Sequence, residues 1–188
     1  MIPLEPNKHY HIYNHANGFE SLFIEDENYR FFLRKYKQYI LPIADTLAYC
    51  LMQNHFHLFI KIKDENIIDT PSSKISTFLS RQFSNLFSSY TQAFNKKYRR
   101  KGSLMYKNFK RKEVKSDDYA IRLINYIHFN PVKDHLSSDI DKWQYSSFNA
   151  INQQGNTLID THTVLELFGG IDNFRYMHQK AMNHDFDY

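Results

Sequence analysis

The sequence predicts an α+β protein in which helices pack on an antiparallel sheet. Segments with strand and helix periodicity follow one another in the order strand, helix, two strands, helix, strand, helix. The connection between the two middle strands is so short that only antiparallel pairing fits it. With 42% hydrophobic and 23% charged residues, the 188-residue chain can bury a core, and helices layered on one sheet are the simplest way to build it.

The first four elements follow from side-chain periodicity and from the turn residues between them. Period-two alternation indicates strands, and three-four spacing of apolar residues indicates helices. Asn17-Gly18 and Gln53-Asn54 predict turns, and Pro42 ends the first helix. The predicted elements are a strand at 8–15, a helix at 25–39 and strands at 45–52 and 54–62.

The later elements have clear helix-start signals. Ser72-Ser73 can cap a long helix with a regular apolar stripe, and Ser116 can cap the last one. Pro131 disfavours helical geometry in the residue before it, so we expect the last helix to end at Asn130. The predicted elements are a helix at 72–98, a strand or ribbon at 105–115 and a helix at 117–130.

We expect one domain over residues 1–150 and a helical extension over 151–188, broken at Gly169-Gly170. The single cysteine, Cys50, excludes an intramolecular disulfide and a cysteine-rich zinc site. The start of the chain lacks the pattern of a signal peptide, and no apolar run approaches the ~18 residues of a membrane span. These features predict a cytoplasmic protein.

A basic segment, residues 96–115, has ten Lys or Arg and one acidic residue, although the whole chain has a net charge of only +4. Such a run is often only a solvated face. Its density and its interleaved aromatic residues favour binding to a polyanion such as nucleic acid. The candidate DNA-binding residues are Lys96, Lys97, Arg99, Arg100, Lys101, Lys107, Lys110, Arg111 and Lys112.

Two candidate sites contain residues able to do chemistry. His55 and His57 lie two apart in a predicted strand, so both imidazoles face one side while Phe56 faces the core; we expect them to line a polar cleft. Two such imidazoles are half of a transition-metal site, although this pattern also arises by chance. Tyr126 and Asn130 lie four apart on one helix face; on spacing alone, a core tyrosine and a helix-terminal asparagine explain them as well.

Together these residues suggest phosphodiester chemistry. A divalent cation can offset the charge that grows on a phosphate under attack. A tyrosine hydroxyl is a weak nucleophile at its ordinary pKa of about 10 and needs a metal or a base nearby. Attack by Tyr126 would leave a covalent phosphotyrosine link that can be resealed.

Several motifs resemble those of the single-tyrosine HUH transposases, and in particular of REP-associated tyrosine transposases. The run LMQNHFH at 51–57 is similar to the family's LMPNHxH motif, and YIHFNPVK at 126–133 is similar to YIxxNPV. Weaker matches in the same order bring the similarity to about residues 8–150. They are NHAN at 14–17, GSLMYKNF at 102–109 and WQYSSF at 143–148.

This resemblance implies a ferredoxin-like antiparallel sheet with the HUH motif on a central strand. It implies that Tyr126 is the nucleophile that becomes linked to a 5′ phosphate, with His55, His57 and Asn130 holding Mg²⁺ or Mn²⁺. The expected partner is single-stranded or hairpin DNA, bound by a monomer or a homodimer during DNA transposition or repeat processing.

The main alternative is a catalytically idle DNA-binding protein with the same fold. The sequence departs from the family pattern at Gln53, at Met105-Tyr106 and at Asp134-His135. We expect none of these departures to affect the chemistry. Because all four presumed site residues are present, an active enzyme is favoured.

Overall fold

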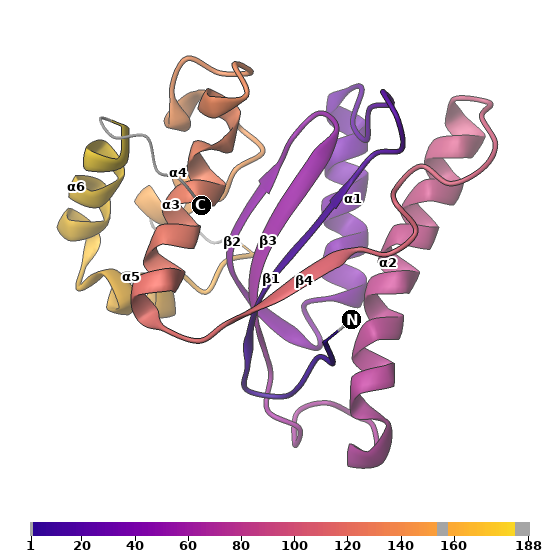
Figure 1. The fold of residues 1–188 in the computed structure, drawn as a ribbon, viewed down its shortest axis with the longest axis horizontal. Helices are drawn as coiled ribbons and strands as arrows, with labels where there is room; N and C mark the ends of the chain where they lie inside the picture. The colour runs from indigo at the N-terminus through magenta and orange to yellow at the C-terminus, as the bar shows by residue number, and fades with distance from the viewer. Residues whose placement is uncertain (1, 154–157, 183–188) are drawn as a thin grey trace.

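One four-stranded antiparallel sheet lies at the centre of the computed structural model, which describes residues 2–153 and 158–182 (Figure 1). Its order is β2-β3-β1-β4, so β3 and β1 are the central strands. The predicted α+β class is confirmed, and the two histidines of the HxH motif lie at the start of a central strand. The strands are β1 (His9–His15), β2 (Ala44–Leu51), β3 (His55–Ile62) and β4 (Lys110–Val114).

Two long helices, α1 (Asp26–Tyr39) and α2 (Ile75–Lys97), cover one face of the sheet (Figure 1). The resulting βαββαβ order with this strand arrangement is the ferredoxin-like fold that the motif resemblance implied. A short 3₁₀ turn, η1 (Ser72–Lys74), precedes α2. The core between helices and sheet includes Phe56 of β3, which confirms that this side chain faces away from the histidines.

The other face of the sheet is covered by α3 (Asp117–Lys133) and by the elements that follow it (Figure 1). Together with the sheet they form a second buried cluster. Within the extension, Gly169 and Gly170 have φ angles of +73° and +116°, which glycine adopts readily and which separate the last two helices. The further elements are η2 (Ile140–Lys142), α4 (Phe148–Asn152), α5 (Thr161–Phe168) and α6 (Ile171–Met182).

The expected end of the last predicted helix is wrong, because α3 continues through Pro131 to Lys133. A proline removes one backbone bond and crowds the preceding turn. Here the side chain of Asn130 donates to the Tyr126 carbonyl at 2.7 Å. Later backbone N–H groups bond to the Asn130 and Pro131 carbonyls, so contacts beyond the helix stabilise its last turn.

The expected strand at 105–115 is shorter in the structure, where only β4 (Lys110–Val114) pairs regularly. Phe109, just before β4, is buried against Phe83 at 5.3 Å between ring centroids, and Met105 pairs with Ala16 only as an isolated bridge. Cys50 is a buried free thiol. Among the helices within the described residues, none has the length and apolar character needed to cross a membrane.

Candidate active site on the α3 face of the sheet

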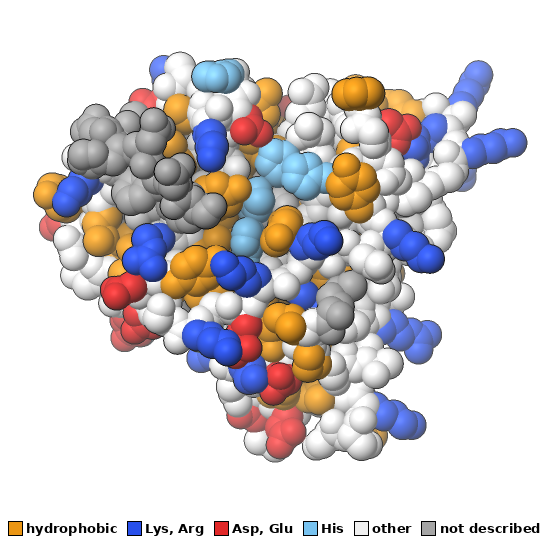
Figure 2. Space-filling view, viewed as in Figure 1, with side chains coloured by type: hydrophobic (Ala, Val, Ile, Leu, Met, Phe, Trp, Pro, Cys, Tyr) orange, Lys and Arg blue, Asp and Glu red, His pale blue; other side chains and the backbone are white. Residues whose placement is uncertain are grey.

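A row of imidazole and phenol rings faces α3 from the two central strands. Strand alternation places His11, Tyr13 and His15 of β1 on this face, together with both HxH histidines of β3. The register pairs His15 with His55 and Tyr13 with His57. The same-face prediction for the HxH pair is therefore confirmed. Histidine side chains form a band near the middle of the face shown in Figure 2.

The expectation that His55 and His57 face an open polar cleft is wrong. Their exposed fractions are 6% and 4%, because other rings cover them. His15 stacks on His55 at 4.5 Å between ring centroids, and the Tyr126 ring lies edge-on to His57 at 5.3 Å. The two imidazoles thus lie buried between the sheet and α3.

Hydrogen bonds at Nδ1 orient the rings of His55 and His57. Nδ1 of His55 donates to the side-chain oxygen of Asn54 at 2.8 Å, so Nε2 of the neutral ring keeps its lone pair. Nδ1 of His57 lies 2.9 Å from Nε2 of His11. When His57 donates in this pair, its Nε2 is free as well. Outer partners that hold Nδ1 in this way orient metal-binding histidines in general.

These imidazoles are neutral at neutral pH. Burial lowers the pKa of His55 and of His11 to about 4. Burial also lowers the pKa of His57, and the neighbouring His11 and His55 lower it further. A neutral imidazole is the form that binds a metal ion, so no proton has to be displaced from these rings.

Tyr126 and Asn130 lie on the same turn of α3, as their spacing predicted. Burial raises the pKa of the Tyr126 phenol, and the Asp134 carboxylate raises it further, whereas a hydrogen bond from Asn130 lowers it. Asn130 is 3% exposed, and its amide nitrogen donates to the Tyr126 carbonyl at 2.7 Å. The phenol is therefore protonated at neutral pH and needs assistance to act as a nucleophile.

Two charged residues at the end of α3 were missed by the sequence analysis. Oδ2 of Asp134 lies 3.9 Å from Nε2 of His55, so this departure from the family pattern lies beside the candidate site. The expectation that it leaves the chemistry unaffected stays a prediction. Lys133 places its ammonium 5.9 Å from the centre of the Tyr126 ring. The continuation of α3 past Pro131 brings both residues to the site.

The basic segment divides into residues that face the candidate site and residues that stabilise the fold. Lys110 and Lys112 pair with Tyr13 and His11 across β4 and β1, so they extend the site face to the edge of the sheet. Arg111 points the other way and donates to the Ser80 hydroxyl of α2 at 3.0 Å.

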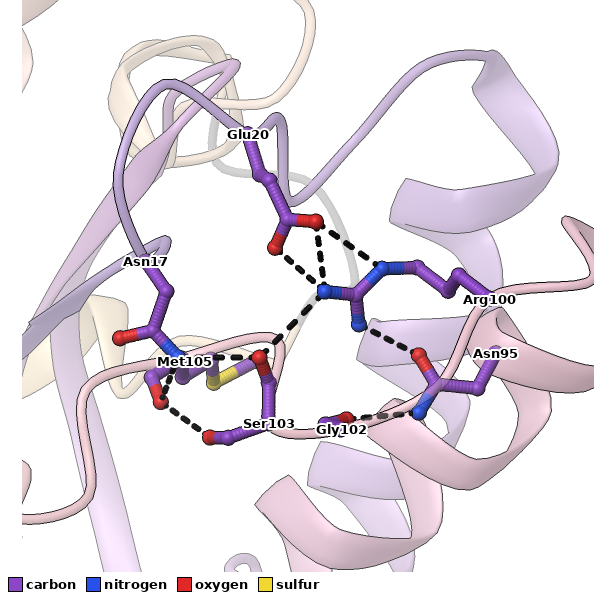
Figure 3. A network of polar contacts seen from close by, with 7 residues as sticks. All are labelled: Asn17, Glu20, Asn95, Arg100, Gly102, Ser103 and Met105. Atoms are coloured by element: carbon purple, nitrogen blue, oxygen red, sulfur yellow. Dashed lines mark hydrogen bonds and ion pairs between the residues drawn. The ribbon is translucent and has the colours of Figure 1, made fainter.

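Arg100 is part of a polar network rather than a free cation (Figure 3). Its guanidinium bonds to the Glu20 carboxylate and to the side-chain oxygen of Asn95. Lys97 similarly forms an ion pair with Glu25. The remaining candidates are exposed: Lys96, Arg99, Lys101, Lys107, Lys110 and Lys112.

A second buried histidine pair lies on the opposite side of α3. His128 is 0% exposed, and its Nδ1 lies 2.8 Å from Nε2 of His178 in α6. Nε2 of His128 lies 2.7 Å from the hydroxyl of Ser147. The sequence analysis left His128 without a role and could not connect the extension to α3.

Among residues 2–153 and 158–182, no three His, Cys, Asp or Glu side chains already lie together at metal-binding distance. A cation beside His55 and His57 would therefore need a ligand of another kind, such as the Asn130 amide oxygen, or a small movement of a side chain.

Comparison with known protein families finds no match. A protein of Haemophilus influenzae described as a putative REP-associated tyrosine transposase is 29% identical over 108 residues. That match covers 56% of this chain and 59% of the relative.

In fold, the chain is similar to a REP-associated tyrosine transposase whose structure was solved bound to a REP hairpin. The TM-score is 0.63 at 14% identity, covering 84% of this chain and 86% of the other. The resemblance inferred from the motifs is thus confirmed in sequence and in fold.

Proposed function

We propose that this chain is a metal-dependent single-strand DNA endonuclease and transposase of the REP-associated tyrosine type, which cuts and rejoins DNA through Tyr126. One observation carries the proposal: the Tyr126 ring lies 5.3 Å from that of His57, at the point where a single turn of α3 meets the HxH face of β3. The similarity to a REP-associated tyrosine transposase supports the same chemistry.

Mg²⁺ or Mn²⁺ is the proposed cofactor, and the residues present fit such an ion. The Nε2 atoms of His55 and His57 are aligned by the bonds at their Nδ1 atoms, and Asn130 offers an amide oxygen. When bound, the ion supplies positive charge against the charge that develops on the phosphate. The amide oxygen of Asn130 is a donor of the kind that Mg²⁺ and Mn²⁺ prefer, and imidazoles bind divalent transition metals.

In the proposed reaction the Tyr126 oxygen attacks a DNA phosphorus atom while the phenol gives up its proton. The bond from phosphorus to the 3′ oxygen breaks, and a proton passes to that oxygen in place of the one that the phenol lost, which leaves a free 3′ hydroxyl and a 5′-phosphotyrosine. Attack of a 3′ hydroxyl on that link reverses the step and rejoins DNA. Half-burial of Tyr126 against the rings of the sheet restricts the direction from which the phosphate can approach.

The proposed substrate is single-stranded DNA next to a hairpin. Exposed lysines at the edge of the sheet, Lys110 and Lys112, lie on the same face as the rings and can contact phosphates. Lys133 adds a cation beside the nucleophile itself. Figure 2 shows further Lys and Arg side chains around the histidine band.

Covalent trapping tests this proposal. Purified protein with Mn²⁺ and a labelled hairpin carrying a single-stranded flank should form a labelled adduct that survives denaturing electrophoresis. Tyr126→Phe should abolish the adduct and leave DNA binding nearly unchanged, because only the hydroxyl is lost. Tyr119→Phe removes the hydroxyl of the other tyrosine in the same helix. It is the matched control and should remain active.

The alternative, an idle DNA-binding protein, would bind the hairpin without forming an adduct under any metal condition. An adduct that persists in the Tyr126→Phe variant would instead assign the nucleophile to a different tyrosine.

A further inference from the structure

The position of Asp134 is unfavourable for the stability of α3. It is the C-cap residue of this helix, where the unpaired carbonyl groups create a partial negative charge. Cations are stabilising at a helix C-terminus and anions are destabilising there. Lys133 follows this rule and Asp134 breaks it, so the carboxylate does not serve the helix.

The side chain that faces the Asp134 carboxylate does not stabilise it either. Its Oδ2 atom faces Nε2 of His55 at 3.9 Å. In the neutral ring this nitrogen holds a lone pair, because Nδ1 donates to the Asn54 oxygen. Two acceptor atoms therefore face each other without a proton between them, beside the negative end of a helix. A cation between them would make this arrangement favourable.

The same carboxylate opposes the chemistry as long as no cation is present. It lies close enough to Tyr126 to disfavour the phenolate. It would also repel a DNA phosphate that approaches the Tyr126 oxygen, since like charges within a few ångströms are unfavourable. A positive ion held between the carboxylate and the phosphate removes both penalties.

We propose that Asp134 is a direct, anionic ligand of the divalent cation, completing a set with His55 and His57. This inference rests on the proposed function and adds a residue to its site. Metal–ligand bonds of about 2.1 Å place neighbouring ligand atoms roughly 3.0–3.4 Å apart. A side chain that is 41% exposed can shorten the 3.9 Å separation to that range by a small rotation.

The proposal also supplies what the other donors lack. Two imidazoles and an amide are all neutral, whereas Mg²⁺ and other hard cations prefer carboxylate oxygens. With Asp134 as a ligand, the site compensates part of the ionic charge and holds the hard ion more tightly. The loss of this carboxylate should therefore weaken Mg²⁺ binding more than Mn²⁺ binding.

Metal titration of the full chain without DNA tests the assignment. Mn²⁺ binding is measured by calorimetry for the wild type, for Asp134→Asn and for Asp172→Asn. The last variant removes the same charge from a fully solvated side chain of α6 and is the matched control. Asp134→Asn should weaken Mn²⁺ at least about tenfold, as changes around metal sites typically do, and the control should match the wild type.

A second measurement distinguishes a metal ligand from a charge that acts at a distance. In water enriched in the magnetic isotope of oxygen, the EPR linewidth of bound Mn²⁺ reports how many water molecules coordinate the ion. If Asp134 binds the ion directly, one additional water should coordinate Mn²⁺ in Asp134→Ala, which offers no side-chain oxygen in its place. Unchanged affinity in Asp134→Asn, or an unchanged number of bound waters in Asp134→Ala, would refute the ligand role. If the wild type binds no Mn²⁺, whereas it folds and binds DNA, the proposed metal-dependent function fails as well.

Discussion

Acid should destabilise the protein through the buried pair His128 and His178, because both rings lie in the core. Nδ1 of His178 donates to the Phe174 carbonyl, so in the neutral ring its Nε2 accepts from Nδ1 of His128. Nε2 of His128 lies against the Ser147 hydroxyl, which donates to the Tyr49 carbonyl at 3.2 Å. Burial disfavours the charged form of each ring and lowers the pKa of both histidines.

The size of the effect follows from the pKa of His178, which burial lowers from 6.5 to about 4. The folded form binds fewer protons than the unfolded form below pH 6.5, so stability is complete above that pH and falls as the pH approaches 4. Between pH 7.5 and 5 this one group should cost about 2 kcal/mol. Burial also lowers the pKa of His128, which acts in the same direction.

Replacing the ring isolates this contribution from that of the other buried histidines. His178→Phe should lower stability at pH 7.5 by about 1–3 kcal/mol, since the buried Nδ1 of His128 loses its acceptor. Lowering the pH from 7.5 to 5 should then decrease the free energy of unfolding by about 2 kcal/mol less in this variant than in the wild type. Urea unfolding with a metal chelator, followed by circular dichroism at both pH values, measures each quantity.

His162→Phe changes an exposed histidine in the same extension and should leave the pH dependence unchanged. If His178→Phe loses stability with acid as steeply as the wild type, the buried pair is not the origin of the effect.

Two further predictions concern DNA. Replacing Lys101, Lys107 and Lys110 by alanine removes exposed charges and spares the Arg100 network, so the salt dependence of single-strand binding should flatten by about 2 units if all three contact phosphates. A slope equal to that of the wild type would show that these residues form only a solvated face. Tyr106 is 51% exposed, and its ring centroid lies 6.3 Å from that of His15. Its replacement by alanine should weaken single-strand binding by about 1–3 kcal/mol if it stacks on a base, whereas Tyr176→Ala on α6 should have no effect in the same fluorescence titration.

Much of the fold could be predicted from the sequence, because periodicity is a local property. The alternation in β1 and the serine cap of α3 both appear where they were expected, and Tyr119 donates its N–H to the Ser116 hydroxyl oxygen. The two errors arose where distant contacts override local rules. Phe109 packs on α2 just before the start of β4, and hydrogen bonds from residues beyond Pro131 carry α3 past it.

The candidate site was predicted only in part, for the same reason. The alternation in β1 already placed His11 and His15 on the face opposite the core, but only strand pairing shows that this face meets His57. Asp134 could not be placed beside His55, because a helix that ended at Asn130 would have left it in a turn of unknown direction.

The C-terminal extension gains a role once both sides of α3 are considered together. Tyr126 and His128 are two residues apart, so they point to different sides of this helix. On one side the ring cluster of the sheet packs against the tyrosine, and on the other side His178 of α6 bonds to His128. Since errors of about 1 Å in the position of a catalytic group can cost about a hundredfold in rate, we expect α6 to act as a brace for the helix that carries the proposed nucleophile. His178→Phe should then reduce the rate of adduct formation at pH 7.5, where the variant is still folded, without changing DNA affinity.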